Sequence, residues 1–361
     1  MSDHLHPGIA APARHAARRA PALIALSALL ILLLALTLSL GSVRIPLQQI
    51  AVILTGGTAE RATWHSIVWL FRLPKAITAA LAGAALAAAG LLMQTLFRNP
   101  LADPFVLGIS SGASLGVALV VLGTTGMLGG STLLGGLGLA GDMGVVLAAS
   151  LGAAAVMALV LAVARRVHTM TLLILGLMFG YAVSALVSIL LHFSIAERIQ
   201  IYIAWTFGSF GGTTWEELRV LVPVLAAALI GAWALAKPLN ALLLGEEYAR
   251  SMGLAIPRAR FWIILSASAA AGAVTAFCGP IGFLGIAVPH LCRALLGTSD
   301  HRVLVPATIL MGAVVALAAD LIAAVPGSQL VLPLNAITAL IGAPVVIWVV
   351  LRSSHIKESM I

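Results

Sequence analysis

The segment LNALLLGEEYARSMGLAI, from Leu239 to Ile256, is a short charged stretch between two long apolar runs. It carries two adjacent glutamates and an arginine, whereas the runs at 218–236 and 259–278 each contain one charged residue near one end. Runs of this kind are typical of membrane-spanning helices, because a bilayer core of about 30 Å needs about 20 residues at 1.5 Å each. A membrane protein that builds a compact charged element between two spans offers that element to another protein. The segment therefore predicts both a membrane fold and a docking surface.

Similar apolar runs recur along all 361 residues, of which 61% are hydrophobic and 9% charged, with a mean hydropathy of +1.12. A soluble domain has roughly a quarter of its residues charged, so this composition excludes one. We predict an all-α polytopic membrane protein with about ten transmembrane helices. The runs lie at 21–41, 73–97, 105–122, 144–164, 170–192, 218–236, 259–278, 281–296, 303–323 and 335–352.

The basic residues indicate how the spans are oriented, because cytoplasmic loops carry an excess of Lys and Arg. Ten spans place both termini on one side. If that side is the cytoplasm, the outer segments carry six of the 20 basic residues and the inner segments the other 14. The outer six are Arg44, Arg61, Arg72, Lys75, Arg198 and Arg219. The net charge of +8 then reflects membrane topology, and we expect no nucleic-acid partner.

The chain is expected to form one membrane domain with two short tails. Residues 1–20 are predicted as a cytoplasmic N-terminal tail and residues 353–361 as a cytoplasmic C-terminal tail. The ten-helix transmembrane domain spans residues 21–352. The charged segment 239–256 lies inside this domain, on the cytoplasmic side.

No motif in the sequence indicates chemistry of its own. Lys75, Lys237 and Lys357 are the only lysines and precede Ala, Pro and Glu, so the phosphate-binding sequence GxxxxGK[ST] is missing. Cys278 and Cys292 cannot make a disulfide framework, and no Cys/His cluster has metal-ligand spacing. We therefore predict no enzyme activity, no resident cofactor and no metal site. Energy for transport must come from a partner or an ion gradient.

Glycines spaced four residues apart mark faces on two of the predicted helices. Gly108, Gly112 and Gly116 form one set, and Gly176 and Gly180 form another. Small residues at this spacing let helix backbones approach closely in lipid, which supplies no hydrophobic drive for association. We expect tight helix packing at these glycines. The alternative is a helix that lines a path for a bulky ligand.

Several longer stretches, in this order and spacing, resemble the permease subunits of type II ABC importers for ferric siderophores, heme and cobalamin, the FecCD or cobalamin-permease-like family. The resemblance covers most of residues 65–352. It rests on RLPK (72–75), GAALAAAGLLMQTLFRNPLADPFVLGISSGAS (83–114), WTFGSFGGTTW (205–215), LNALLLGEEYARSMGL (239–254), GPIGFLGIAVPHLCR (279–293), DHRVLVPATILMGAVVALAADL (300–321) and TALIGAPVVIW (338–348).

The resemblance implies a homodimeric permease in the bacterial inner membrane, with a translocation path along the dimer axis. Two copies of a separate ATPase, which binds the ATP and Mg²⁺, are implied at the cytoplasmic face, and a periplasmic substrate-binding protein at the outer face. The implied cargo is an iron chelate, either heme or a ferric siderophore, with cobalamin less favoured. Alternating access would be driven by the ATPase.

The family's coupling helices, which sit in a cleft of the ATPase, correspond to the charged segment 239–256. Turning nucleotide-driven closure into helix movement requires a rigid element with few flexible joints. The alternative is an ordinary solvated loop. The residues assigned to coupling by this resemblance are Gly245, Glu246, Glu247, Ala249, Arg250 and Gly253.

Four residues align with the family's cytoplasmic gate, at the inner ends of the second and fifth spans. Asn99 and Leu101 follow the second span, and Thr169 and Met170 begin the fifth. The alternative is that Asn99-Pro100 only ends a helix and starts a turn. A gate and a helix end are compatible.

Arg72 matches an outward arginine that, in the family, pairs with a glutamate of the binding protein, and Lys75 follows it by one turn. The alternative for Arg72 is anchoring at the membrane interface. The chain departs from the family pattern at Ala324, where the cobalamin permease has a second outward arginine, and at Val331, where it has an acid. We expect Arg198 or Lys75 to take over the second docking contact.

An ion-coupled secondary transporter is the main alternative function. That class usually places several carboxylates or histidines at mid-membrane depth, whereas Asp320 is nearly the only acid within a span here. Asp320 lies near the outer end, where we expect solvent or an arginine to satisfy it. His192 and His290 are isolated, and we expect His290 to be a packing residue. An intramembrane enzyme is a weaker alternative, because no nucleophile–base or metal constellation is present.

Overall fold

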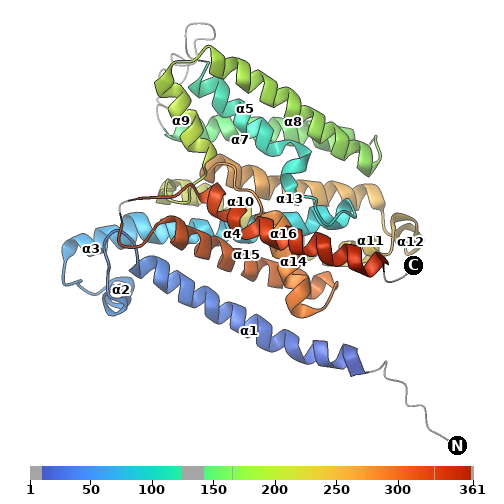
Figure 1. The fold of residues 1–361 in the computed structure, drawn as a ribbon, viewed down its shortest axis with the longest axis horizontal. Coiled ribbons are helices and arrows are strands. Elements are labelled where there is room, and N and C mark those ends of the chain that lie inside the picture. Colours follow the sequence, from blue (N-terminus) through green and yellow to red (C-terminus); the bar gives the residue numbers. More distant parts are fainter. Residues whose placement is uncertain (1–9, 124–141, 165, 329, 359–361) are drawn as a thin grey trace, which may run out of the picture.

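The computed structural model describes residues 10–123, 142–164, 166–328 and 330–358 (Figure 1). Within these residues the chain is helical and contains no strand, which confirms the all-α prediction. Parts of the two predicted tails, 1–20 and 353–361, lie outside the described residues.

The described part of the chain contains apolar helices at all ten predicted runs. Seven helical segments are long and apolar enough to cross a membrane, and three further apolar helices are shorter. The long ones are α1 (Ala10–Ser39), α4 (Leu73–Leu96), α7 (Asp142–Ala164), α8 (Thr169–His192), α10 (Trp215–Ala234), α13 (Ile256–Cys278) and α15 (His301–Ala323). The shorter ones are α5 (Ile109–Val121), α14 (Leu284–Leu296) and α16 (Leu334–Glu358), of which Leu334–Val349 is the apolar part.

Short helices complete the bundle. The α3 helix and the π-helix η1 run directly into α4, so that this span extends from Ala62 to Leu96. A capping box starts α10, in which Thr214 and Glu217 each bond the other's backbone N–H. The short helices are α2 (Leu47–Leu54), α3 (Ala62–Ser66), η1 (Ile67–Arg72), η2 (Pro104–Leu107), α9 (Ala196–Thr206), α11 (Ala236–Leu243) and α12 (Glu246–Ser251).

The α4 helix runs through the centre of the bundle and packs against α1, α10, α13, α14 and α15 (Figure 1). The most apolar window of the span that contains it is 83% buried, and Ala and Gly make up almost half of the residues of α4. A methyl group at Gly83 would overlap the Gly312 carbonyl of α15, and one at Gly90 would overlap the Gly285 carbonyl of α14. Small residues therefore bring three backbones into direct contact at the centre.

A second close-packed group consists of α5, α7 and α8. Gly112 faces Gly152 of α7 so closely that a methyl group on either would overlap the other's backbone, and Gly176 of α8 meets the backbone of η2. These contacts confirm the packing that the glycine spacing predicts. Gly108 has a different role, because its φ of +80° lets η2 turn into α5. A methyl group at Gly180 would lie 3.3 Å from the Ser111 hydroxyl oxygen and would meet no backbone among the described residues.

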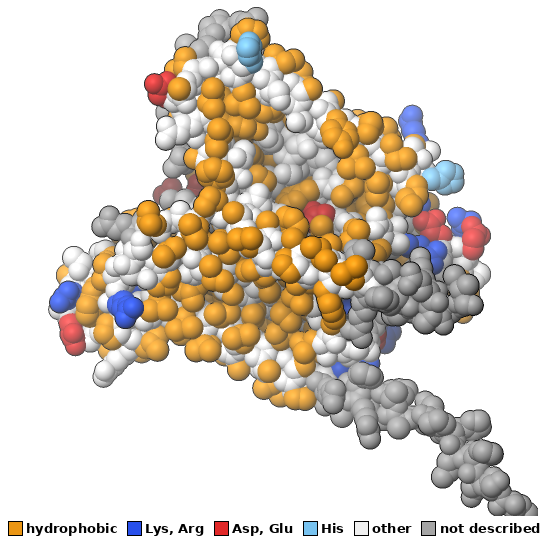
Figure 2. All heavy atoms as spheres, in the orientation of Figure 1, with side chains coloured by type: hydrophobic (Ala, Val, Ile, Leu, Met, Phe, Trp, Pro, Cys, Tyr) orange, Lys and Arg blue, Asp and Glu red, His pale blue; other side chains and the backbone are white. Residues whose placement is uncertain are grey.

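Charged side chains gather at the two ends of the bundle. Figure 2 shows a broad hydrophobic band across the middle of the visible face, with most Lys, Arg, Asp and Glu beyond it. We call the end that holds α11 and α12 the α12 end, and the opposite one, with α2 and α3, the α2 end (Figure 1). Helix α1 begins and α16 finishes at the α12 end, as an even number of spans requires.

We expect the substitution Gly90→Ala to destabilise the fold by about 1–3 kcal/mol, because the added methyl group must push α4 away from the α14 backbone. Thermal unfolding of the detergent-purified protein would measure the loss. Gly212→Ala is the matched control, since nothing lies within 4 Å of the added atom and the backbone there is not left-handed. Equal unfolding temperatures for the two variants would contradict the close contact.

Candidate functional site

Two glycines bound the charged helix α12 at the α12 end. Gly245 has a φ of +111° and Gly253 a φ of +86°, values that residues with a side chain rarely adopt. The first lets the chain turn sharply from α11 into α12, and the second lets it leave α12 toward α13. Between them, Ala249 is fully buried and fixes α12 to the bundle. The segment is a short rigid element with a turn at each side.

The outer face of α12 carries apolar side chains beside its charges. Leu244, Tyr248 and Met252 recur every four residues and are each more than half exposed. Glu247 and Arg250 form an ion pair of 3.1 Å within the helix, and both are exposed. Apolar groups ringed by charge are typical of protein docking surfaces. Only Tyr248 lies within α12, because Leu244 ends α11 before the turn at Gly245 and Met252 caps the end of α12, so no helical spacing in the sequence marks this apolar surface.

Glu246 is bonded differently from its neighbour, because its carboxylate reaches two other helices. Oε1 accepts from Arg260 Nη2 of α13 at 3.2 Å and from Thr169 Oγ1 of α8 at 3.3 Å. Arg260 Nη1 also donates to the Val167 carbonyl before α8, at 3.1 Å. The structure thus joins a residue predicted for coupling to one predicted for the gate, which lie 77 positions apart.

A buried hydrogen-bond network ties α11 to the central helix. Asn240 Oδ1 lies 2.8 Å from both the backbone N and Nδ1 of His301, and its Nδ2 donates to Asp300 at 2.6 Å. His301 is 1% exposed, and its Nε2 lies 2.8 Å from the Thr95 hydroxyl of α4. The backbone N–H of Arg302 and then the Asn240 amide lower the pKa of Asp300. Sequence reasoning missed this network, for which the Asp at position 300, an N-cap residue, was the available signal.

The two predicted gate segments have separate partners within one subunit. Asn99 Oδ1 accepts from the Leu101 backbone N–H at 2.9 Å, which is the turn expected after a helix stop. Thr169 bonds Glu246, as described above. The side chains of Leu101 and Met170 are exposed, with Met170 at 63%. Closure of these segments onto one another stays a prediction for the assembled dimer.

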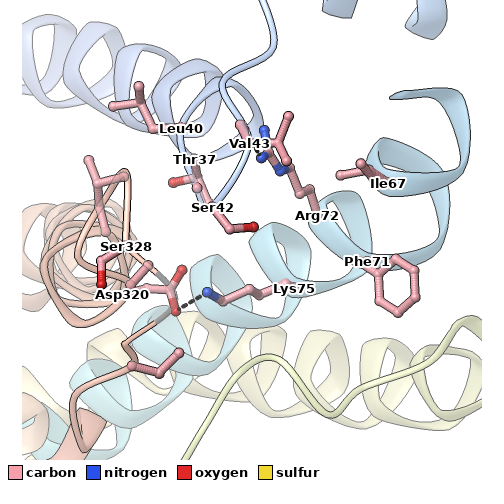
Figure 3. Close-up of a pocket in the computed structure, with 14 residues that line it drawn as sticks. Thr37, Leu40, Ser42, Val43, Ile67, Phe71, Arg72, Lys75, Asp320 and Ser328 are labelled. Carbon is pink, nitrogen blue, oxygen red and sulfur yellow. Dashed lines mark hydrogen bonds and ion pairs between the residues drawn. The ribbon is translucent and has the colours of Figure 1, made fainter. Parts of the chain in front are cut away.

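A cavity of about 520 Å³ opens at the α2 end between α1, η1, α4 and α15 (Figure 3). Lys75 Nζ lies 3.0 Å from Asp320 Oδ1 across its floor, and Asp320 is 4% exposed. The partner of Asp320 is therefore a lysine, which corrects the expectation of solvent or an arginine. Ala324 and Val331, where the chain lacks the family's charges, line the same cavity.

The guanidinium of Arg72 is turned into the chain. It donates to the Leu38 carbonyl at 2.6 Å, to the Ser39 carbonyl at 2.9 Å and also to the Val43 carbonyl, so that Arg72 closes the loop after α1. Arg72 is only 8% exposed, and Lys75 is engaged with Asp320 (Figure 3). Docking of a binding protein through Arg72 or Lys75 stays a prediction. It requires one of them to leave these partners.

The apolar helices, with a short exposed element at the α12 end, are those of a multi-pass membrane protein. The chain belongs to the FecCD transport family, whose profile matches residues 29–352. It is thus a permease of the ABC-importer type, a transport subunit and not an enzyme.

Named relatives and a solved structure agree with this assignment. The chain is 39% identical over 287 residues to the vitamin B12 import system permease protein BtuC of Klebsiella pneumoniae, covering 79% of this chain and 82% of the relative. Identity to BtuC of Salmonella typhi is 38% over 289 residues, covering 80% and 84%. A solved structure, described as the inward-facing conformation of a candidate metal-chelate type ABC transporter, matches with a TM-score of 0.78 and 28% identity. The match covers 91% of this chain and 98% of that one.

We expect Tyr248→Ser to weaken association with the partner ATPase about tenfold, because truncating an exposed aromatic at a docking surface removes buried contact area. Titration of the purified permease with its ATPase would measure the affinity. Leu47→Ser, which truncates an exposed leucine at the opposite end, is the control and should leave the affinity unchanged. An unchanged affinity in Tyr248→Ser would place the ATPase elsewhere.

We expect Lys75→Met to destabilise the protein by about 1–3 kcal/mol, because it leaves the buried Asp320 carboxylate unpaired. Lys75→Met combined with Asp320→Leu should recover much of the loss, since both charges are then gone. Unfolding free energies of wild type, the two single variants and the double variant form a double-mutant cycle, which gives the coupling energy between Lys75 and Asp320. Arg250→Gln, which breaks an exposed pair, should cost less than about 0.5 kcal/mol. Strictly additive effects would refute a coupled pair.

Proposed function

We propose that this chain is one of two identical membrane subunits of an ATP-driven importer, which carries a metal chelate into the cytoplasm. In this proposal the α12 end faces the cytoplasm, so that both termini are cytoplasmic. The observation that carries the proposal is α12 itself. It is a rigid helix set between two left-handed glycines, with apolar and charged side chains exposed beyond the apolar band. A separate ATPase is the partner that such an element fits.

An exposed polar stripe on α8 supports a dimer. Only 22% of the apolar window of α8 is buried, the second lowest share among the long spans in the described residues. Tyr181, Ser184 and Ser188 lie on one face of this helix and are exposed. Lipid is a poor environment for polar side chains, so this face should meet protein or water. A second copy of the chain, with an aqueous path between the two, provides both.

The distribution of acidic residues supports ATP over an ion gradient as the energy source. Among the described spans, Asp320 is the acidic residue that does not lie in the first turn of a helix. Lys75 neutralises it. Glu216 and Glu217 lie in the first turn of α10, where Glu217 is used in capping. A proton relay needs a series of ionisable groups across the membrane, and these residues do not form one.

The named relatives guide the choice of substrate. The relatives at 38–39% identity are named as vitamin B12 import permeases, which supports cobalamin over the heme and ferric siderophores that we expected from the sequence. A candidate metal-chelate transporter of similar fold supports the broader class. We therefore propose cobalamin as the first substrate to test, and iron chelates as the second.

We expect uptake to require ATP on the α12 side and to be indifferent to a protonophore. The permease would be reconstituted in proteoliposomes with its ATPase and binding protein, and given cyanocobalamin, heme or a ferric hydroxamate in turn. Accumulation of one of these only with hydrolysable ATP supports the proposal. Uptake that collapses with the proton gradient at constant ATP would favour the secondary transporter instead.

A further inference from the structure

We propose that Glu246, Arg260 and Thr169 form the link through which movement of α12 is passed to the start of α8. The inference rests on the proposed function and adds the residues that couple the docking helix to the gate segment. Glu246 is the first residue of α12 and Thr169 the first of α8, while Arg260 lies in the second turn of α13. The starts of three helices therefore meet at one carboxylate.

The geometry fixes the start of α8 from two directions. The Glu246 carboxylate holds the Thr169 hydroxyl at 3.3 Å, and Arg260 Nη2 lies within 3.2 Å and 3.5 Å of its two oxygens. Arg260 Nη1 donates to the Val167 carbonyl at 3.1 Å and to the Ala164 carbonyl at 3.5 Å. The ion pair of Glu246 and Arg260 thus holds both the Thr169 side chain and the backbone of the turn between α7 and α8. Hydrogen bonds that involve a charged group are stronger than neutral ones, so these contacts can transmit a displacement of α12 to the start of α8.

The burial of this ion pair distinguishes it from the other pair on α12. The Arg260 side chain is 14% exposed and that of Glu246 is 38% exposed. The pair of Glu247 and Arg250 is far more exposed, and it joins residues three apart in the same helix. Screening by water and salt weakens the exposed pair more. Glu246 therefore connects α12 to the bundle, whereas Glu247 faces the partner.

Within one subunit, α8 is less embedded than the helices that carry Arg260 and Thr95. Its apolar window is 22% buried, against 67% for α13 and 83% for the span that contains α4. In the dimer of the proposed function its exposed face meets the second copy, so a displacement of the α8 start also reaches the path between the subunits. Displacement should therefore appear as movement of the α8 start, beside the predicted gate residue Met170. Energetic coupling between two sites needs an element that can adopt two arrangements, and each site must shift the equilibrium between them.

The test uses variants that change one hydroxyl. Thr169→Val removes the group that bonds Glu246 and keeps the shape, Thr169→Ser keeps the hydroxyl, and Glu246→Gln keeps the shape but removes the charge. Thr171→Val is the matched control, because it removes the same group from an exposed position of α8. Each variant is reconstituted with the ATPase and the binding protein. Substrate imported and ATP hydrolysed are measured in the same vesicles.

We expect Thr169→Val and Glu246→Gln to import about tenfold less substrate per ATP. For Thr169→Val, which lies outside α12, ATPase affinity and hydrolysis should stay within twofold of wild type. Thr169→Ser and Thr171→Val should stay within twofold of the wild-type ratio. A spin label at position 170, with the two buried cysteines replaced by Ala, should show a nucleotide-dependent shift that Thr169→Val abolishes.

Different failures identify different errors. A wild-type import ratio in Thr169→Val would overturn the link while leaving ATP-driven import intact. An equal loss in Thr169→Ser and Thr169→Val would also overturn it, because the hydroxyl would then be irrelevant. Wild-type vesicles that import nothing with ATP would refute the proposed function itself. If Glu246→Gln does not fold, the comparison of Thr169→Val with Thr169→Ser still tests the link.

Discussion

Direct backbone contact along α4 is the constraint on which the rest of the structure depends. Lipid gives helices no hydrophobic reason to associate, so the bundle relies on close packing and buried hydrogen bonds. Gly83 and Gly90 bring α15 and α14 onto the central helix. That approach sets the distances at the α12 end of α4, where Thr95 reaches His301 and Gln94 accepts from Arg293 at 2.7 Å. The position of the docking helix is thus determined within the core.

Charged groups near the membrane are paired in two distinct ways. At the α2 end, Arg72 closes a loop onto backbone carbonyls and Lys75 neutralises Asp320, so both cations are used for structure. At the α12 end, one acid faces outward and the other, Glu246, holds two neighbouring helices. The α12 end therefore combines a surface for a partner with a connection into the bundle. The α2 end has a cavity in which Lys75 pairs with one oxygen of Asp320, while the other oxygen of that carboxylate is buried without a hydrogen-bond partner among the described residues.

Sequence predicted the spans well because bilayer thickness imposes a length on each apolar run, and all ten runs became helices. The segment 239–256, which the family resemblance assigned to coupling helices, does contain two short helices, α12 and the end of α11. Sequence did not predict that Thr169 meets Glu246, because a contact between positions 77 apart has no periodic signal. Nor could it tell whether Arg72, at a helix end, points outward or folds back onto a loop, because that choice depends on free carbonyls nearby.

The polar stripe on α8 has a consequence for how the protein is made. A newly inserted single subunit presents Tyr181 and Ser184 to hydrocarbon, which solvates such groups poorly, whereas the Ser188 hydroxyl donates to the Ser184 carbonyl. In the proposed dimer, burial of this face against protein or water would remove that cost, so assembly would add to the stability of each subunit in the membrane.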